Sequence, residues 1–539
     1  MGEIKTAVIS VSNKSWVGKL AKFLAEEGVT MYCSAGTLAE LKKKQVPAKA
    51  IEKLTGGKEM LDGRLKTLDS RLYAGLLADR SESSHLETLA ALGVAPIDLV
   101  VANFYPFHEK VKARTKPAKA QELIDIGGVS MVRAAAKNYQ QVVVLVDPED
   151  YKPFIQEWRE QSGVISLETR TKFARKAFAY CRRYDEAIEN YFAGLLEKKK
   201  RKKALLGKEA LDLESSLNLT FTRLRSLRYG ENPHQRAALY LVSHGVSVPF
   251  RVLQGLEMSY NNFQDAAAAF RICRMPFDKP YAACVIKHVN PCGVAIDDDP
   301  IRALQRAKEG DPVSAYGGIL GVNFEVREAE AREIGKTFLE VAVAPKFTPE
   351  AARLLSSKKK LRLVETGQEA LEQERQRVLD FNEKKAESPL TFVRTPFGFL
   401  VQEEDLLLTR PQDIEVVSDM PLRPQYKPDL MLGLVVIRFL KSNSIALFKD
   451  LMMVGASAGQ PSRVDATRIA IAKAGKLASG SILVSDAFFP FADSVELAHK
   501  AGVAVLAAPS GSIRDHEVID RANSLKLCLV FLPHRHFCH

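Results

Sequence analysis

Three short polar segments near the start of the chain carry the residue types that bind a phosphate. Residues 10–14 follow one apolar run, residues 34–37 follow the next, and residues 63–67 form a short loop; together they supply hydroxyls, glycines and cations. A phosphate is held by such groups and by the free backbone N–H groups at a helix start. Each segment alone is better explained as a helix cap, but three at consecutive strand ends favour one anion site.

A second group of reactive residues lies in the middle of the chain. Lys287 and His288 follow an apolar run at 282–286, and a cation beside a histidine lowers its pKa and favours the neutral, basic form. The alternative is a solvated strand end. Arg228 and Tyr229 could clamp a phosphate or simply form a turn, and residues 535–539 are either frayed or tied into a site.

The cysteine and histidine spacing does not favour a metal site. Cys284, His288 and Cys292 would align on a helix, but the valine and isoleucine between them favour a strand, and Pro291 breaks a helix. Zinc deaminases need P-C-x-x-C, and the second cysteine is missing here. We therefore expect no metal. The seven cysteines form no CxxC pair, which indicates free thiols in a reducing compartment.

Apolar runs that alternate with helical segments must position the N-terminal groups. Strands are expected at 6–11, 29–33, 97–102 and 142–146, with helices at 15–27 and from the 34–37 turn to residue 44. This alternation predicts a parallel sheet covered on both faces, with ligands at the carboxyl ends of its strands. We expect one helix over 168–196 and a polar, basic linker over 197–225.

The rest of the chain is again of α/β type. Helices are expected at 429–441 and 463–478, and the stretch 350–390, rich in Lys, Glu and Gln, is expected to be helical and solvated. Strands are expected at 282–286, 318–322, 341–344, 481–484 and 503–507.

Composition limits the classes of protein that fit. A chain of 539 residues implies two or more domains, because single cores stop growing near about 250–300 residues. We expect no membrane span, no secretory signal and no lipidation. The net charge of +12 owes much to the lysine-rich run 198–203, which we interpret as a solvated helix end or linker, with an RNA or membrane contact as the alternative.

The strings SVSNKS, SAGT, DGRLKT, NFYPF, IDIGGVSMVRAAAKN and SLETR occur in this order. They resemble the bifunctional AICAR transformylase/IMP cyclohydrolase family of purine biosynthesis, and the similarity covers essentially the whole chain. The resemblance implies a methylglyoxal synthase-like IMP cyclohydrolase domain at 1–196, a basic linker at 197–225, and an AICAR transformylase domain at 226–539 made of two cytidine deaminase-like subdomains.

The same resemblance implies the reaction and its setting. The formyl group of 10-formyltetrahydrofolate passes to AICAR, giving FAICAR, and FAICAR then loses water and closes to IMP. The enzyme is expected to be a cytoplasmic homodimer that needs no metal and binds a ribotide and a folate, with no membrane and no nucleic acid as partner.

Site residues are carried over from the family position by position. His288 is the expected base in formyl transfer, Lys287 stabilises the developing charge, and Asn443 orients the formyl oxygen. The ring-closure group has an oxyanion-binding lysine and a proton relay, namely Lys66 and then Tyr105, Asp125 and Lys137. The ligand contacts are Ser12, Lys14, Ser34, Gly36, Thr37, Arg64, Thr67, Arg228, Tyr229, Asn262, Tyr316, Gly317, Glu340, Arg463, Ala487, Phe488, Arg535, Phe537 and His539.

Some positions depart from the family pattern. Asp69 with Ser70 replaces a His-Pro pair, Ala35 replaces a glycine, and Asn13 replaces an aspartate. A carboxylate at position 69 would oppose anion binding if it faced the phosphate. A transformylase with a weakened cyclohydrolase is therefore the alternative function. A basic nucleic-acid-binding protein is a remote alternative, because the lysine-rich run lacks interleaved aromatic residues.

Overall fold

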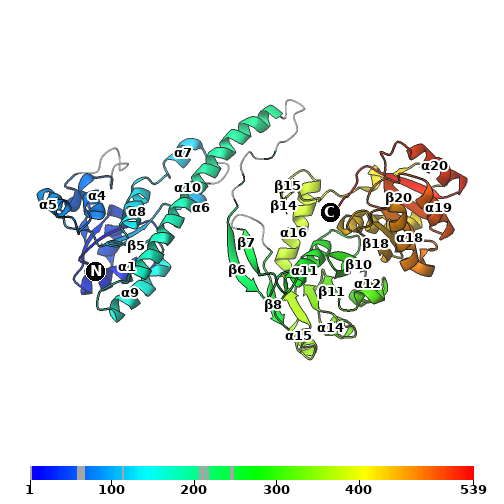
Figure 1. The fold of residues 1–539 in the computed structure, drawn as a ribbon, viewed down its shortest axis with the longest axis horizontal. Coiled ribbons are helices and arrows are strands. Elements are labelled where there is room, and N and C mark those ends of the chain that lie inside the picture. The colour runs from blue at the N-terminus through cyan, green and yellow to red at the C-terminus, as the bar shows by residue number, and fades with distance from the viewer. Residues whose placement is uncertain are drawn as a thin grey trace. The chain divides into compact units, whose positions relative to one another are not determined.

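The computed structural model describes residues 3–57, 67–111, 115–204, 213, 217, 219–242 and 248–539, without the side chains of 108–109 and 196–204. The chain divides into two compact units, unit 1 (residues 1–215) and unit 2 (residues 216–539), which are coloured blue to green and green to red in Figure 1. The division lies within the stretch 197–225. Helix α10 (Leu167–Ala204) extends into that stretch, so the backbone of the lysine-rich run 198–203 is helical.

Unit 1 has, among its described residues, a five-stranded parallel sheet in the order β3-β2-β1-β4-β5. The sheet separates two apolar clusters: Val8 and Val100 face one, whereas Ala7 and Val101 face the other. Both faces are thus covered, as the apolar runs predicted. The four expected strands are confirmed, and the fifth is very short. The strands are β1 (Thr6–Val11), β2 (Thr30–Cys33), β3 (Lys49–Ala50), β4 (Leu99–Asn103) and β5 (Val143–Leu145).

Helices of unit 1 fall on the two faces of this sheet according to their apolar stripes. One face is covered by α1 (Val17–Glu26), α2 (Ala35–Lys43) and α9 (Tyr151–Glu160). The other face is covered by α4 (Ser70–Leu77), α5 (Ser83–Leu92), α8 (Gly127–Lys137) and α10. Short connecting helices are α3 (Glu52–Thr55), α6 (Phe107–Lys110), α7 (Pro117–Gln121) and the 3₁₀ turn η2 (Pro148–Asp150).

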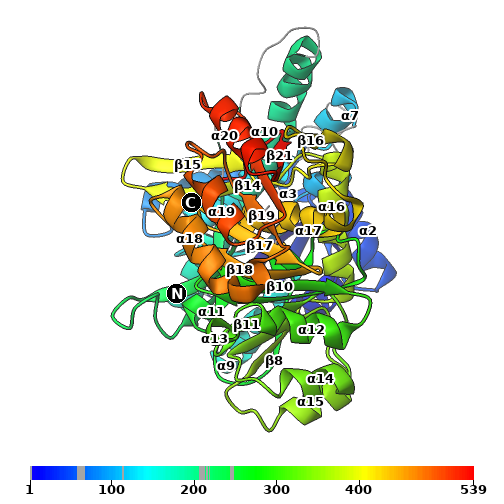
Figure 2. The same cartoon turned by 90° about the vertical axis from the view of Figure 1, so that its right-hand side faces the viewer.

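Unit 2 contains a twelve-stranded mixed sheet within the described residues, and its strands follow one another down Figure 2. The order β8-β13-β12-β11-β9-β10 in one half matches β16-β21-β20-β19-β17-β18 in the other, and every corresponding pair has the same direction. The halves join where β10 pairs antiparallel with β18. Two α/β subdomains, as expected, therefore share one sheet.

The strands of this sheet are β8 (Arg251–Gln254), β9 (Tyr281–Lys287), β10 (Asn290–Asp297), β11 (Ile319–Val322), β12 (Val341–Ala344), β13 (Arg362–Glu365), β16 (Glu415–Val416), β17 (Ile445–Lys449), β18 (Met452–Ser457), β19 (Ile482–Ser485), β20 (Val505–Pro509) and β21 (Cys528–Leu532). Two separate hairpins are β6–β7 (Phe221–Leu227, Ala237–Val242) and β14–β15 (Leu390–Thr395, Gly398–Glu403). The helices are α11 (Tyr260–Cys273), α12 (Pro300–Glu309), α13 (Pro312–Ala315), α14 (Glu328–Ile334), α15 (Pro349–Leu355), α16 (Gln368–Asn382), α17 (Lys427–Val436), α18 (Arg463–Ala474), α19 (Asp493–Lys500) and α20 (Asp515–Ser524).

The expected strands and helices of unit 2 are confirmed, with one correction in the stretch 350–390. That stretch was predicted to be helical and solvated, but it contains the buried strand β13 between α15 and α16. Glu374 of α16 is also buried, and its charge is compensated by Arg274, which donates a hydrogen bond to it at 2.8 Å. The polar composition concealed the strand, since β13 has only Leu363 and Val364 as apolar residues.

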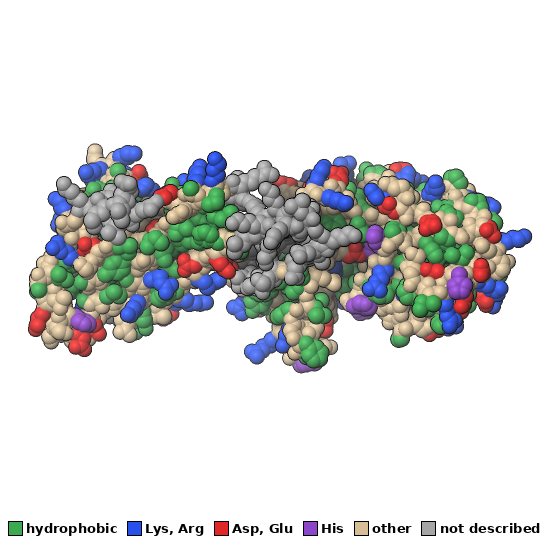
Figure 3. All heavy atoms as spheres, turned by 90° about the horizontal axis from the view of Figure 1, so that it is seen from above, with side chains coloured by type: hydrophobic (Ala, Val, Ile, Leu, Met, Phe, Trp, Pro, Cys, Tyr) green, Lys and Arg blue, Asp and Glu red, His purple; other side chains and the backbone are tan. Residues whose placement is uncertain are grey.

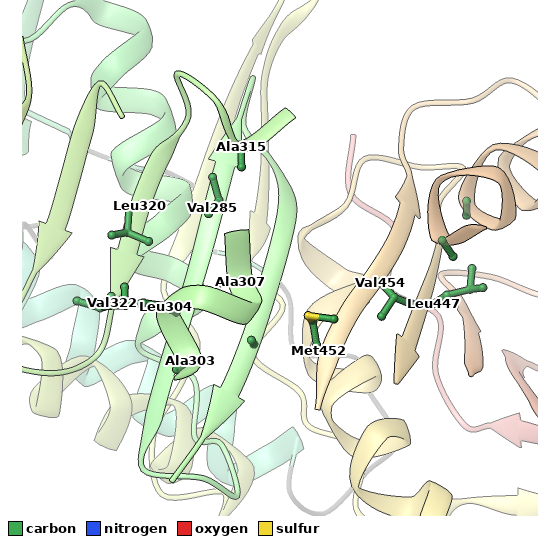
Figure 4. Packing of buried hydrophobic residues seen from close by; sticks show 14 of the residues in the cluster. Val285, Ala303, Leu304, Ala307, Ala315, Leu320, Val322, Leu447, Met452 and Val454 are labelled. Carbon is green, nitrogen blue, oxygen red and sulfur yellow. The ribbon is translucent and has the colours of Figure 1, made fainter. Parts of the chain in front are cut away.

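One apolar cluster runs through both halves of unit 2 (Figure 4). In the close-up, Val285 and Leu304 lie on the β9–β10 side, and Met452 and Val454 lie on the β18 side. Burial of these side chains contributes roughly 1.5–3 kcal/mol each to folding. The strand edges of the two halves are thus held in a fixed position relative to each other.

The described surface mixes charges of both signs. Blue lysine and arginine spheres are interspersed with red aspartate and glutamate on the face that Figure 3 shows. None of the helices in the described part of the chain combines the length and hydropathy of a membrane-crossing segment.

Candidate functional site

The loops after β1 and β2 in unit 1 meet through their hydroxyl groups. Ser10 Oγ lies 3.0 Å from Ser34 Oγ, and Ser34 Oγ lies 3.3 Å from Thr37 Oγ1. The backbone N–H of Val11 donates to Thr37 Oγ1 at 3.1 Å. The Ser34 side chain therefore does not cap α2, whose first N–H groups stay available for an anion.

Lys14 adds a cation to this edge of the sheet. Its Nζ donates to the Val11 carbonyl at 3.3 Å, and a Cβ built on Gly36 would lie 3.6 Å from that Nζ. The loop that carries Lys14 is fixed by Asn103 at the end of β4, whose Oδ1 accepts the N–H groups of Ser12 and Asn13, both at 2.7 Å. Hydroxyls, a helix start and an ammonium group from two of the three predicted segments thus converge at one place; residues 63–66 of the third lie outside the described residues.

Asp125 and Thr67 lie at the start of α8. Asp125 Oδ1 accepts from the Gly128 N–H at 2.8 Å, and a Cβ on Gly127 would come within 2.2 Å of Thr67 Oγ1. The two glycines are required because any side chain there would collide with these polar groups. Helix α8 leads directly into β5, so its N-terminus lies at the same, carboxyl-terminal edge of the sheet as the loops after β1 and β2.

Two tyrosines of α10 hold the loops that carry Tyr105 and Asp125. The Tyr180 hydroxyl accepts from the Phe104 N–H at 3.1 Å, and the Tyr184 hydroxyl accepts from the Asp125 N–H at 2.7 Å. Burial raises the pKa of Tyr184 to about 12, so the phenol stays protonated and donates to the Leu123 carbonyl at 3.2 Å. Tyr180 and Tyr184 were not predicted as functional residues, and their only signal in the sequence is the i, i+4 spacing.

Lys137 lies at the end of α8 opposite to the Asp125 end. It is exposed at the last turn of α8, about 15 Å along the helix axis from Gly127 and therefore at the opposite edge of the sheet. The expected relay of Tyr105, Asp125 and Lys137 stays a prediction. Tyr105 follows β4 at the correct edge and is 41% exposed, with its hydroxyl 3.2 Å from Lys110 Nζ. Arg64 and Lys66 lie outside the described residues.

The positions that depart from the family pattern have local structural roles. Asp69 is the N-cap of α4, and its Oδ1 accepts from the Arg71 N–H at 2.9 Å. Asn13 Oδ1 accepts from the Ser15 N–H at 2.9 Å, and Ala35 is the exposed first residue of α2. The Asp69 carboxylate is thus engaged in capping a helix.

In unit 2, Lys287 ends β9 and His288 occupies the hairpin turn before β10. His288 is exposed, and both it and Val289 have a positive φ, at 53° and 66°. Lys287 Nζ donates to the Tyr316 carbonyl at 2.8 Å. The Val289 N–H donates to Asp265 Oδ1 of α11 at 2.6 Å. Lys287 and His288 therefore lie at a hairpin turn that these hydrogen bonds hold in place.

The neighbouring loops bring further predicted residues to this turn. Asn262 Nδ2 donates to Glu340 Oε2 at 3.0 Å, and the Gly317 N–H donates to the Phe338 carbonyl at 2.8 Å. The exposed Tyr316 ring packs on Phe338 with centroids 5.3 Å apart. Arg228 and Tyr229 follow β6; the Arg228 guanidinium lies over the Tyr229 ring at 5.4 Å.

Asn443 belongs to a buried polar network. Its Nδ2 donates to the carbonyls of Gln460 and Pro461, at 2.9 and 3.2 Å, and its Oδ1 accepts from Arg463 at 2.7 Å. Arg463 is buried and pairs with Asp486, which is fully buried. The side chain of Asn443 is thereby held in one orientation. Asp486 was missed because a lone acid in an aromatic segment carries no sequence signal.

An open cavity of ≈ 390 Å³ adjoins this network. Its lining includes many of the predicted folate and nucleotide residues, together with apolar neighbours: Asn443, Pro461, Ser462, Arg463, Val464, Ala487, Phe488, Pro490, Phe491, Asp493 and Phe537.

The C-terminal segment is tied to the network. The Cys538 carbonyl accepts from the Ser442 N–H at 2.8 Å, and His536 bonds to Asp405 at 2.6 Å. Arg535 and His539 both lie against the Phe537 ring, at 4.7 and 5.5 Å.

The His288 turn and Asn443 lie at the same edge of the sheet. Three successive antiparallel pairings connect β9 to β17, so the end of β9 and the start of β17 share that edge. Asn290 Oδ1 accepts from the Lys441 N–H at 3.0 Å and links the two segments directly. An imidazole, a lysine amine and an oriented amide are thus gathered on one side of unit 2. Among the described residues, no group of three or more His, Cys, Asp or Glu is arranged to hold a metal ion.

The chain is similar to known proteins along nearly its whole length. The family model "AICARFT/IMPCHase bienzyme" matches residues 135–473, and the "MGS-like domain" model matches residues 17–130. Proteins named "Bifunctional purine biosynthesis protein PurH" are 39% identical in Acetivibrio thermocellus, 40% in Anoxybacillus flavithermus and 41% in Bacillus cytotoxicus, each over 99% of this chain and 100% of the relative. The crystal structure of ForH is 33% identical over 35% of this chain and 100% of ForH, with a TM-score of 0.33. The chain therefore belongs to the AICARFT/IMPCHase bienzyme family, the bifunctional AICAR transformylase/IMP cyclohydrolase enzymes of purine biosynthesis.

Proposed function

We propose that unit 2 transfers the formyl group of 10-formyltetrahydrofolate to AICAR and that unit 1 closes the FAICAR product to IMP. The observation that carries the assignment to unit 2 is the placement of the Lys287–His288 turn and Asn443 at one sheet edge, joined by the Asn290–Lys441 hydrogen bond. The functional boundaries are proposed at 1–196 and 226–539.

Formyl transfer needs a base because the substrate amine is conjugated with its ring and is a weak nucleophile. His288 is exposed and can accept the proton that the amine loses during attack on the formyl carbon. Lys287, beside it, stabilises the charge on the tetrahedral intermediate and assists departure of tetrahydrofolate. Asn443 is fixed by Arg463 and aligns the formyl oxygen. The aromatic lining around Phe488 and Phe537 suits the flat ring of a folate.

Ring closure needs fewer catalytic groups than formyl transfer, because the formyl carbon and the attacking nitrogen already belong to one molecule. Holding them in contact supplies most of the acceleration. The phosphate would sit at the start of α2 beside Lys14, and Lys66 would stabilise the oxyanion. Tyr105, Asp125 and Lys137 would move protons as water leaves. Asp69 is occupied as a helix cap, so its presence does not favour a weakened cyclohydrolase.

We place the enzyme in the cytoplasm as a homodimer. The seven free cysteines suit a reducing compartment. The hairpin β14–β15 exposes Phe397, Phe399 and Leu400, at 100, 66 and 65%. An isolated two-stranded hairpin is marginally stable, and such a patch is typical of a protein contact. The molar mass in solution, measured by sedimentation equilibrium, tests the dimer.

The two-site assignment is tested with Lys66→Ala and His288→Ala. AICAR and 10-formyltetrahydrofolate are supplied, and tetrahydrofolate and IMP are followed separately. We expect Lys66→Ala to release tetrahydrofolate without forming IMP. His288→Ala should release neither product from AICAR but should still close supplied FAICAR to IMP. Loss of both steps in either folded variant would contradict separate sites.

A further inference from the structure

The two halves of the unit 2 sheet contain the same lysine-ended hairpin, although only one carries the predicted base. Lys287 ends β9 and its Nζ donates to the Tyr316 carbonyl at 2.8 Å; Lys449 ends β17 and its Nζ donates to the Ser479 carbonyl at 2.7 Å. Each acceptor precedes a glycine with positive φ, Gly317 at 72° and Gly480 at 75°. His288 in the first half therefore corresponds to Asp450 in the second.

Both hairpin turns adopt a conformation that their residues do not favour. His288 and Val289 have φ of 53° and 66°, and Asp450 and Leu451 have φ of 54° and 62°. A two-residue turn with φ positive at both positions normally takes asparagine and glycine, and a β-branched valine is an outlier there. Each turn therefore depends on partners outside it to keep this shape.

An aspartate from the preceding helix supplies that partner in both halves. Asp265 of α11 accepts the Val289 N–H at 2.6 Å, and Asp429 of α17 accepts the Leu451 and Asp450 N–H groups at 2.5 and 3.0 Å. Burial raises the pKa of both carboxyls, whereas the bonds from the turns favour the charged form. The repeated arrangement shows that this aspartate fastens the turn whether or not a base is present.

We propose that Asp265 is a positioning residue for formyl transfer, which fixes the turn that presents His288 to the reacting amine. The proposal rests on the proposed role of His288 as the base. Asp265 also lies three residues after Asn262 on the same face of α11, and Asn262 holds Glu340. One face of α11 thereby contacts both the turn that carries His288 and the Glu340 carboxylate.

The charge of Asp265 has a second consequence. The groups that face it are the Val289 N–H and His288 from the turn and Glu340 from the loop before β12. The Asp265 carboxylate therefore stabilises the positive charge that develops on the His288 imidazole as it takes the proton of the amine. Asparagine at this position would keep an oxygen for the Val289 N–H and lose only the charge. Alanine would lose both.

The experiment compares Asp265→Ala and Asp265→Asn with Asp429→Ala in the full-length chain. Asp429 is a matched control because β9 and β17 run in opposite directions, which puts its turn at the other edge of the sheet. We expect Asp265→Ala to lower kcat for formyl transfer by about 10- to 100-fold with little change in KM for AICAR. Asp265→Asn should recover only part of this rate, because it keeps the hydrogen bond to the turn but loses the charge. Asp429→Ala should keep the wild-type kcat per folded molecule.

The outcomes separate the inference from the proposed function. Equal losses of kcat in Asp265→Ala and Asp429→Ala would overturn the inference, since both aspartates would then act only on folding. If Asp265→Ala does not fold, a wild-type kcat in Asp265→Asn would overturn it, and a lowered kcat with an unchanged KM for AICAR would support it. If His288→Ala retains formyl transfer, the proposed function itself fails. Ring closure of supplied FAICAR should be unchanged in all three aspartate variants.

Discussion

Asp486 is fully buried at the centre of the network that orients Asn443, and its replacement tests that network. Its carboxylate pairs with Arg463 and accepts from the Ser442 hydroxyl. In Asp486→Asn the shape is kept but the Arg463 guanidinium stays buried without its counterion. We therefore expect a large loss of stability in unit 2, together with a fall in formyl transfer, because Arg463 holds Asn443 Oδ1 at 2.7 Å.

The magnitude follows from the burial of both partners. Breaking a buried ion pair by removing one charge costs about 3–5 kcal/mol. With an m-value of about 3 kcal/mol/M for urea, the midpoint of unit 2 unfolding should fall by about 1–2 M.

Two spectroscopic probes distinguish the units in the same sample. The chain has 2 tryptophans, Trp16 and Trp158, and both belong to unit 1. Trp158 is buried against Phe23 and Phe154, so its fluorescence reports unfolding of unit 1. Far-UV circular dichroism reports both units. Asp486→Asn should lower the midpoint of the dichroism transition from unit 2 and leave the fluorescence midpoint where it is.

Asp465→Asn provides the control on the same helix. Asp465 pairs with Arg468, and both side chains are at least half exposed, so its loss should cost no more than about 1 kcal/mol. If Asp486→Asn lowers the midpoint of the dichroism transition no more than Asp465→Asn does, the reasoning that burial makes the Arg463–Asp486 pair indispensable is refuted. A matching shift of the fluorescence midpoint would refute independent unfolding of the units.

Two further predictions concern a helix cap and a buried carboxylate. Asp69→Ala removes the α4 cap and should destabilise unit 1 by about 1 kcal/mol, measured in the fluorescence transition. The rate of ring closure should not rise. A faster ring closure would mean that this carboxylate opposes the substrate phosphate. Burial of Glu333 opposes its ionisation, but hydrogen bonds from Lys308, Lys336 and Gln305 outweigh that effect and lower its pKa to about 2. The folded state then binds fewer protons than the unfolded state, so about 3 kcal/mol of stability present above pH 4.5 should be lost as pH falls towards 2, and Glu333→Gln should flatten this decline in the dichroism midpoint. An unchanged pH dependence in Glu333→Gln would contradict the assignment.

Local patterns predicted much of the fold because buried parallel strands are read directly as apolar runs. β1 was predicted over its full range, and β12 was too. β13 was missed, since its ends are charged and its burial comes from α15, α16 and β8 around it. The β17–β18 hairpin was also missed, because its turn has neither asparagine nor glycine to mark it.

Site residues divide in the same way. Lys287 and His288 were predicted because two polar groups after a buried strand stand out, and Lys14 and Thr37 were predicted because they follow strand ends. The short sequence separation of Lys137 and Asp125 conceals the helix of about 15 Å that lies between them. Asp265 could have been found only by comparing the two halves, through an aspartate that precedes a lysine-ended strand in each.

By itself, the sequence determined which segments form buried strands, that the loops after β1 and β2 carry anion-binding groups, and which family motifs occur in order. The tertiary structure alone decided which of those groups meet. Asn290 and Lys441 are 151 residues apart in the chain, and Arg463 and Asp486 pair across separate elements. Such contacts arise from sheet order and strand direction, which depend on the packing of the whole unit and leave no mark in any short stretch of residues.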